Sequence, residues 1–182
     1  MSQVLKALPY GIMVANLFKA GASQAEELIH AAIGLSGEAG ELADASTMDN
    51  IIEELGDAEF YLEAYLQRLG SWSHESLEKA ARLMASDQPR VSLGTVTHEL
   101  SVATSALLDA TKKVWVYGRP VSDLKAFDEL VSIRVVLNAA YELLGVQRQV
   151  VLDANQAKLG KRFPEGVYSG ADALARADKN GG

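Results

Sequence analysis

The acidic residues that could do chemistry in this chain occur as two pairs with the same spacing. Glu38 and Glu41 form the first pair, and Glu54 and Asp57 form the second pair. Side chains three positions apart on an α-helix share one face, so each pair would point two carboxylates in the same direction. Mg²⁺ and Mn²⁺ prefer oxygen ligands. If two helices carry these pairs and pack antiparallel, the four carboxylates predict a divalent-metal site.

The alternative is that these acids form a solvated helix face, as most glutamates at such spacings do. Three glycines near the first pair, Gly34, Gly37 and Gly40, bear on the choice. Each costs a helix interior about 1 kcal/mol relative to alanine, so close helix approach or ligand access should compensate for them. For Gly34 taken alone, simple helix–helix contact is an equally good explanation.

Long helices must position these pairs. Apolar residues between about positions 23 and 45 recur at intervals of three and four, which predicts a helix with one buried face. A second helix is expected to begin near Ser46 or Thr47, because Ser46 and Asp49 resemble a capping box. It should end at Gly70, a residue type that commonly terminates helices.

The rest of the chain is also helical in pattern, and no alternating segment indicates a strand. Residues 86–90 indicate a linker, and the tail from Phe163 is expected to end loosely. The predicted fold class is all-α, a helical bundle in one domain over residues 1–182. The further helices are expected over residues 73–85, 93–113, 122–144 and 147–160.

The two halves of the chain look related, which favours a tandem repeat. Placing Gly70 over Gly145 pairs Glu54 with Glu129. A helical hairpin cannot bury its own apolar face and must pair with another, so a duplication is physically reasonable. Helical sequences also align by chance, and identities are few. The prediction is a carboxylate-bearing repeat over residues 1–88 and a degenerate repeat over residues 89–182.

Four stretches of the sequence resemble the MazG-type all-α nucleoside triphosphate pyrophosphohydrolases, of the MazG-like and dimeric dUTPase superfamily. The family pattern is E-x-x-E, a spacer and E-x-x-D, followed by an Asn/Lys tail. The stretches are HAAIGLSGEAGELAD (residues 30–44), IEELGD (52–57), FYL (60–62) and NQAKLGKRFPEG (155–166). They stand in the family order and together span most of the chain.

The resemblance implies a hydrolase that converts a nucleoside triphosphate to the monophosphate and pyrophosphate. Water would attack the α-phosphorus, with Mg²⁺ or Mn²⁺ held by the catalytic residues Glu38, Glu41, Glu54 and Asp57. One of these four, or Glu53, would accept the proton of the water. The candidate substrate contacts are Lys112, Tyr117, Arg119, Asn155, Lys158, Lys161 and Arg162. The base and sugar of the substrate stay open.

The second half departs from the family pattern. Its positions equivalent to the four carboxylates are Ala103, Ala106, Glu129 and Ser132, so three of the four acids are missing. It does contain the basic loop that the first half lacks. We therefore expect one composite site, with metal ligands from the first half and cations from the second. In the alternative, the second half is only a packing partner.

Composition sets the remaining expectations. The formal net charge is −7, from 24 acidic and 17 basic residues, which argues against a general nucleic-acid partner. The chain has no cysteine and no apolar run of about 20 residues, so disulfides and a membrane span are not expected and a cytoplasmic location is. Family relatives suggest a homo-oligomer, a dimer or tetramer. Two alternative functions remain, a non-catalytic nucleotide-binding regulator of the same fold and a purely structural helical module.

Overall fold

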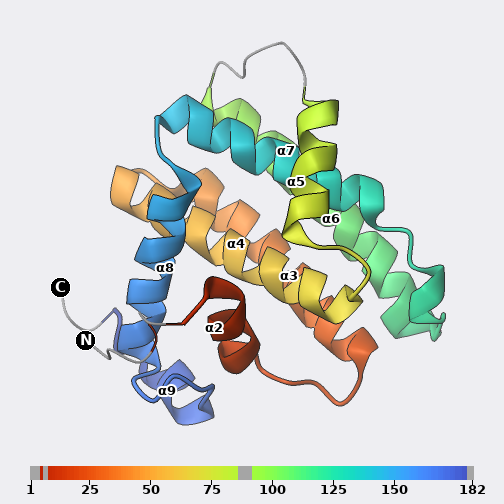
Figure 1. Cartoon of the computed structure of the whole chain (residues 1–182), viewed down its shortest axis with the longest axis horizontal. Helices are drawn as coiled ribbons and strands as arrows, with labels where there is room; N and C mark the ends of the chain where they lie inside the picture. The colour runs from red at the N-terminus through yellow and green to blue at the C-terminus, as the bar shows by residue number, and fades with distance from the viewer. Residues whose placement is uncertain (1–4, 6–7, 86–91, 180–182) are drawn as a thin grey trace.

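The computed structural model describes residue 5, residues 8–85 and residues 92–179 (Figure 1). These parts of the chain contain eight α-helices, one 3₁₀ turn and no strand, which confirms the all-α prediction. The elements are α2 (Tyr10–Leu17), α3 (Gln24–Asp44), α4 (Met48–Leu69), α5 (His74–Met84), α6 (Leu93–Tyr117), η1 (Val121–Asp123), α7 (Phe127–Leu144), α8 (Arg148–Arg162) and α9 (Gly170–Ala175).

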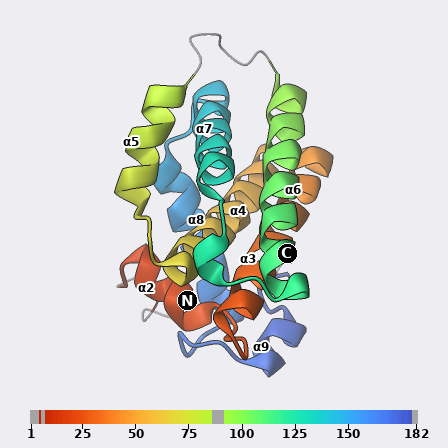
Figure 2. The ribbon, with the colours of Figure 1, turned by 90° about the vertical axis from the view of Figure 1, so that its right-hand side faces the viewer.

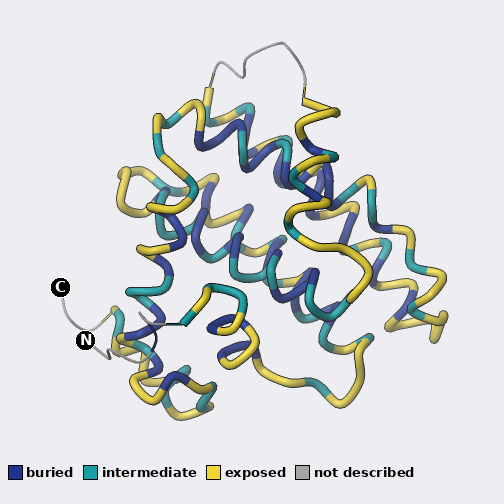
Figure 3. The backbone as a smooth tube through the Cα atoms, in the orientation of Figure 1, coloured by how far each residue is buried: buried dark blue, intermediate teal, exposed yellow. Residues whose placement is uncertain are grey.

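Two packed helix pairs make up the centre of the molecule. The first helix pair is α3 with α4, and the second helix pair is α6 with α7; α6 packs along α3 and joins them. Figures 1 and 2 show α5 beside α7 on one side, and α8 and α2 against α4 on the other. The buried residues follow the facing sides of the central helices (Figure 3). The relation between the two pairs as a duplication stays a prediction.

Hydroxyl side chains begin the two helices that carry the acidic pairs. The Ser23 Oγ accepts a hydrogen bond from the Glu26 amide at 3.2 Å, as expected for a helix that starts there. The next helix is capped by Thr47, whose Oγ1 accepts from the Asn50 amide at 3.2 Å. The predicted capping box at Ser46 is therefore wrong by one residue, because Thr47 already satisfies the first free amides. Gly70 ends this helix with φ 72°, as predicted.

Several predicted boundaries move in the structure. The helix expected to stop at residue 113 continues to Tyr117, and the one expected from residue 122 begins at Phe127, after the separate turn η1. The short helix α2 was not predicted. The tail is more ordered than expected, because it forms α9 and the Tyr168 amide donates to the Asn16 carbonyl at 3.0 Å. The predicted linker at residues 86–90 lies outside the described residues.

A buried ionic cluster fastens α4 to α7 and α8. The Glu59 carboxylate is fully buried and accepts two hydrogen bonds from Arg134, at 2.6 and 2.8 Å. It also accepts two from Arg148, both at 2.8 Å, and one from the Tyr141 hydroxyl at 2.6 Å. Although burial opposes ionisation, the two guanidinium groups hold the pKa of Glu59 below its ordinary value. The two helix pairs therefore share one charged core contact.

None of the helices in the described ranges combines the length and the apolar character that a bilayer crossing requires.

Candidate functional site

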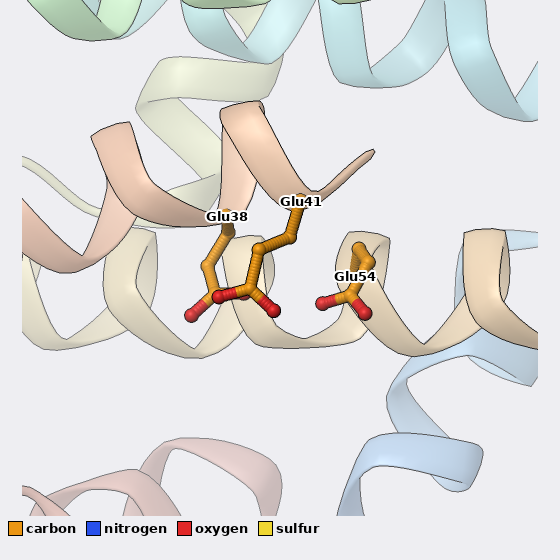
Figure 4. Close-up of side chains that lie close together, drawn as sticks. All are labelled: Glu38, Glu41 and Glu54. Atoms are coloured by element: carbon orange, nitrogen blue, oxygen red, sulfur yellow. The ribbon is translucent and has the colours of Figure 1, made fainter. Parts of the chain in front are cut away.

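Three of the four predicted metal ligands converge at one point. Glu38 and Glu41 project from the second half of α3, and Glu54 projects from the first half of α4 (Figure 4). One carboxylate oxygen from each lies within 4.8 Å of the others. The short connection through Thr47 reverses the chain, so the two helices bring the two acidic motifs to the same place.

Burial of the neighbouring positions fixes where these carboxylates stand. Leu35, Ala39 and Leu42 of α3 are almost completely buried, as is Leu55 of α4. Because these residues fill the contact between the helices, the acids at adjacent positions emerge along its edge. Glu38 and Glu54 are half-buried there, and Glu41 is exposed. The spacing of the buried apolar residues on α3 and α4 thus determines where the acidic side chains lie.

The clustered charges perturb one another. Burial first, and then the charges of Asp57, Glu41 and Glu54, raise the pKa of Glu38 to about 8. The pKa of Glu54 is also raised, by burial and by the charges of Asp57 and Glu41. Glu38 and Glu54 share a hydrogen bond. Glu38 therefore tends to keep a proton near neutral pH, and a bound cation would take the place of that proton.

The fourth predicted ligand, Asp57, lies beside the cluster and is held by α8. Its Oδ1 accepts a hydrogen bond from Asn155 Nδ2 at 2.7 Å, and its Oδ2 pairs with the Lys158 ammonium. Asn155 is buried and accepts in turn from the Tyr10 hydroxyl at 2.9 Å. A Cβ on Gly56 would stand 2.8 Å from the Asn155 Cβ, so this glycine lets α8 approach. Asn155 and Lys158, which were predicted to contact substrate, thus bind the Asp57 carboxylate in the structure.

The acids border a pocket of about 280 Å³, the carboxylate pocket. Its acidic lining is Glu38, Glu41, Glu53, Glu54 and Asp57. Its aromatic lining is Phe18, His30, Phe60, Tyr61, Phe163 and Tyr168. Its basic lining is Lys19, Arg162, Arg176 and Lys179. Acidic, aromatic and basic groups that are distant in the sequence therefore meet in one concave site.

The three tail cations predicted to contact substrate differ in where they lie: Arg162 lines the carboxylate pocket, whereas Lys158 and Lys161 do not. Arg162 lines the carboxylate pocket and forms two hydrogen bonds with Asp178, at 2.8 and 2.6 Å. Lys158 pairs with Asp57 and also with Glu53, at 3.3 Å. Lys161 is exposed and lines a neighbouring pocket together with Lys158. Of these tail cations, only Arg162 borders the carboxylate pocket directly.

The basic loop of the second half does not reach this site, so the composite arrangement is wrong for the loop, whereas Arg162 of the second half does line the pocket. Lys112, Tyr117 and Arg119 are exposed and do not line the carboxylate pocket. Lys112 pairs instead with Asp109 at 2.6 Å. The reason is the direction of α6, which runs antiparallel to α3 and carries the loop to the end of the bundle away from the second half of α3 (Figures 1 and 2).

Sequence reasoning missed three cations of the pocket, Lys19, Arg176 and Lys179. All three lie outside the recognised motifs: Arg176 and Lys179 are in the tail that was expected to end loosely, and Lys19 precedes the first predicted helix. His30 packs between Phe18 and Tyr61, with ring centroids at 4.5 and 6.2 Å. Burial is the main cause that lowers the pKa of the His30 imidazole. His30 is consequently a packed aromatic wall of the pocket.

A larger pocket, of about 600 Å³, opens on the second helix pair. Its lining includes Ala103, Ala106, Glu129 and Ser132, the four positions that the sequence aligns with the carboxylates. We call it the second pocket. Valines from both helices supply much of the remaining lining: Val102, Val131, Val135 and Val136.

Comparison of the chain with protein-family models, with curated proteins and with solved structures found no match.

Proposed function

We propose that the protein is a divalent-metal-dependent hydrolase of the MazG-like type that cleaves a nucleoside triphosphate to the monophosphate and pyrophosphate. The convergence of Glu38, Glu41 and Glu54 beside a pocket with aromatic and basic walls carries this proposal. A triphosphate has an aromatic base at one end and a polyanion at the other. The pocket offers complementary groups for both ends.

The three carboxylates fit a hard divalent cation. Oxygens bound to one Mg²⁺ at about 2.1 Å lie at most about 4.2 Å apart, so the observed limit of 4.8 Å requires only small side-chain rotations. Burial first, and then the negative charges of Asp57, Glu41 and Glu54, raise the pKa of Glu38, and a bound cation would offset those charges. When bound, Mg²⁺ or Mn²⁺ would lower the pKa of a coordinated water and offset charge on the phosphates.

Other residues of the pocket divide the remaining tasks. Asn155 and Lys158 hold Asp57 at the edge of the acidic cluster, where it can serve as the fourth carboxylate. Glu53 is poorly suited to accept a proton, because Lys179 and Lys158 lower its pKa even though burial opposes this. The general base is therefore sought among the other four acids. The guanidinium of Arg162 suits a phosphate, with which it can replace its present pair with Asp178.

A non-catalytic nucleotide-binding regulator is the second candidate. The hydrogen bonds from Asn155 and Lys158 to Asp57 favour it, because they occupy one of the four expected ligands. Both candidates would bind a nucleotide with metal, and only the hydrolase would release pyrophosphate. A purely structural module would gain no thermal stability from Mg²⁺ or Mn²⁺, since only a ligand of the folded state raises the melting temperature.

The deciding experiment is a panel of ribo- and deoxynucleoside triphosphates incubated with the protein at fixed Mn²⁺. Monophosphate and pyrophosphate should appear in equal amounts, as measured by anion-exchange chromatography. Glu38→Ala and Glu54→Ala should each abolish the release, and Glu129→Ala, the counterpart of Glu54→Ala in the second pocket, should leave it unchanged. Binding of nucleotides without turnover would select the regulator. Release of orthophosphate in place of pyrophosphate would contradict cleavage at the α-phosphorus.

A further inference from the structure

We propose that the C-terminal segment, residues 163–179, forms a second phosphate-binding wall of the carboxylate pocket. In this arrangement Arg176 and Lys179 contact the outer phosphates of the substrate. The inference rests on the proposed function and extends it, because neither residue belongs to the motifs that suggested a hydrolase. Both residues line the pocket that contains the acidic cluster.

The base of the C-terminal segment is fixed on the bundle. Phe163 is buried, and its ring lies 5.9 Å from that of Tyr168. The Tyr168 amide donates to the Asn16 carbonyl at 3.0 Å, which ties the segment to the end of α2. Ser169 then caps α9, accepting from the Asp172 amide at 3.3 Å. These contacts hold α9 beside the pocket, with the basic residues directly after it.

Two ion pairs of opposite polarity join the C-terminal segment to the pocket helices. Lys179 of the segment pairs with Glu53 of α4 at 2.6 Å. Asp178 of the segment pairs with Arg162 of α8 at 2.6 Å. A polyphosphate entering the pocket would offer oxygens to both Arg162 and Lys179. Arg162 and Lys179 can therefore each replace a carboxylate partner with a phosphate oxygen, since both already line the pocket.

The backbone at Arg176 supports a role for its side chain. Among the described residues it is the only non-glycine with positive φ, at 45°. The helices α4, α6 and α7 end in the same left-handed region, and each uses a glycine there: Gly70, Gly118 and Gly145. Glycine reaches this conformation without the steric cost that other residues meet. An arginine at the end of α9 thus accepts a strain that glycine would remove, while its side chain borders the pocket.

Charge balance favours the same assignment. One divalent cation would leave the clustered acids of the pocket with a net negative charge, and a triphosphate adds further negative charge. Cations within the pocket are needed to offset it, and Arg162, Arg176 and Lys179 line it. A guanidinium can bond two phosphate oxygens at once, and an ammonium acts as a compact charge. The wall therefore favours triphosphates over monophosphates.

Binding of inorganic tripolyphosphate with Mn²⁺, measured by isothermal titration calorimetry on the full chain, tests the wall without requiring catalysis. Arg176→Gly keeps, and should relax, the left-handed backbone while it removes the side chain. We expect it to weaken binding about tenfold, as for loss of one charge-assisted contact. Lys179→Met should do likewise, and Arg176→Lys should restore part of the affinity. Arg119→Gly, at the distant basic loop, is the matched control and should bind normally.

The outcomes separate this inference from the proposed function. Unchanged tripolyphosphate binding in both Arg176→Gly and Lys179→Met would overturn the wall, even in an active enzyme, and so would the absence of binding by the unaltered protein. Weakened binding by these variants, with no pyrophosphate released from any nucleotide by the unaltered protein, would support the wall and reject the hydrolase. In an active enzyme, the variants should raise KM for triphosphates about tenfold with little change in kcat.

Discussion

The carboxylate pocket borders the first helix pair and the second pocket borders the second helix pair, and the two differ in charge at the four positions that the sequence aligns. In the first helix pair all four positions are acidic, and three of these acids have carboxylate oxygens within 4.8 Å of one another. In the second pair, alanine stands at positions 103 and 106 and serine at 132, and only Glu129 remains acidic. The second pocket is also larger, at about 600 against 280 Å³. The two helix pairs thus carry very different pockets, and the chemistry of each must be inferred from its side chains.

The comparison extends to the glycines of α3. With the same alignment, Gly37 corresponds to Val102 and Gly40 to Ser105. A Cβ at Gly37 or Gly40 would meet nothing within 4 Å, whereas Val102 lines the second pocket. Open space beside these two glycines of α3 is therefore a second difference between the two helix pairs.

The largest expected effect tests whether the two helix pairs form one cooperative unit. Glu59→Gln would leave the buried guanidinium of Arg134 without its carboxylate. We expect a loss of about 3–5 kcal/mol in the free energy of unfolding. Tyr141→Phe removes one hydrogen bond to the same carboxylate and should cost about 1.5–3 kcal/mol. Urea unfolding followed by circular dichroism measures both.

The surface pair of Arg82 with Glu78 provides the control, since Arg82 is largely exposed and Arg82→Ala should change stability by less than about 1 kcal/mol. Two separate unfolding transitions in the unaltered protein, with Glu59→Gln affecting only one, would show that the pairs are independent units. The comparison of the pockets would then concern two domains.

The next effect concerns which pocket binds metal. Mutating a residue that hydrogen-bonds to a metal ligand typically weakens metal binding about 10–100-fold, and mutating the ligand itself should weaken it at least as much. Glu38→Gln should therefore weaken Mn²⁺ binding by about a hundredfold or more, as followed by calorimetry or electron paramagnetic resonance. Glu129→Gln should have no effect. A Mn²⁺ site that disappears in Glu129→Gln would break the comparison, because the second pocket would then bind metal too.

The pH dependence of metal binding follows from the raised pKa of Glu38, about 8 against an ordinary 4.5. A carboxyl whose pKa is higher in the folded state stabilises it at low pH, and that contribution is lost as the pH rises through about 8. A divalent cation takes the place of the proton, so Mn²⁺ affinity should rise by up to about tenfold per pH unit between pH 6 and 8.

Calorimetry in buffers of different ionisation enthalpy should detect about one proton released per ion at pH 7. The stabilisation by Mn²⁺ in thermal melts should grow over the same range. Glu38→Gln should remove the pH dependence together with the affinity, whereas Glu129→Gln should preserve both. Proton release that persists in Glu38→Gln would assign the titration to another group.

Much of this fold could be predicted because its signals are local. Apolar spacing predicted one helix to within a residue at each end, and three of the four acids converged as their spacing indicated. The buried cluster was missed, although Arg134 stands alone in the apolar run IRVVL, which is a signal for a buried partner. Nothing local identifies that partner as Glu59, next to the acidic motif.

Long-range direction was harder to predict than helix content. The basic loop was assigned to the site on family order alone, and the antiparallel course of α6 places it elsewhere. The cations of the pocket that were missed, Lys19, Arg176 and Lys179, come from segments without a periodic pattern, and the placement of the last two depends on single contacts such as that of Tyr168 with Asn16. Such contacts leave no spacing in the sequence.

The smallest expected effect distinguishes the two explanations of the α3 glycines. A Cβ at Gly34 would stand 2.3 Å from the Tyr61 ring, so close packing requires this glycine, and Gly34→Ala should cost about 1–3 kcal/mol. Packing does not require Gly40, and Gly40→Ala should stabilise the helix by about 0.5–1 kcal/mol in urea unfolding. If ligand access explains its presence, the added methyl group stands where the metal-bound substrate must come, and KM should rise severalfold. A gain in stability with unchanged KM would show that the open surface of α3 serves no ligand, and the glycines would no longer distinguish the two pockets.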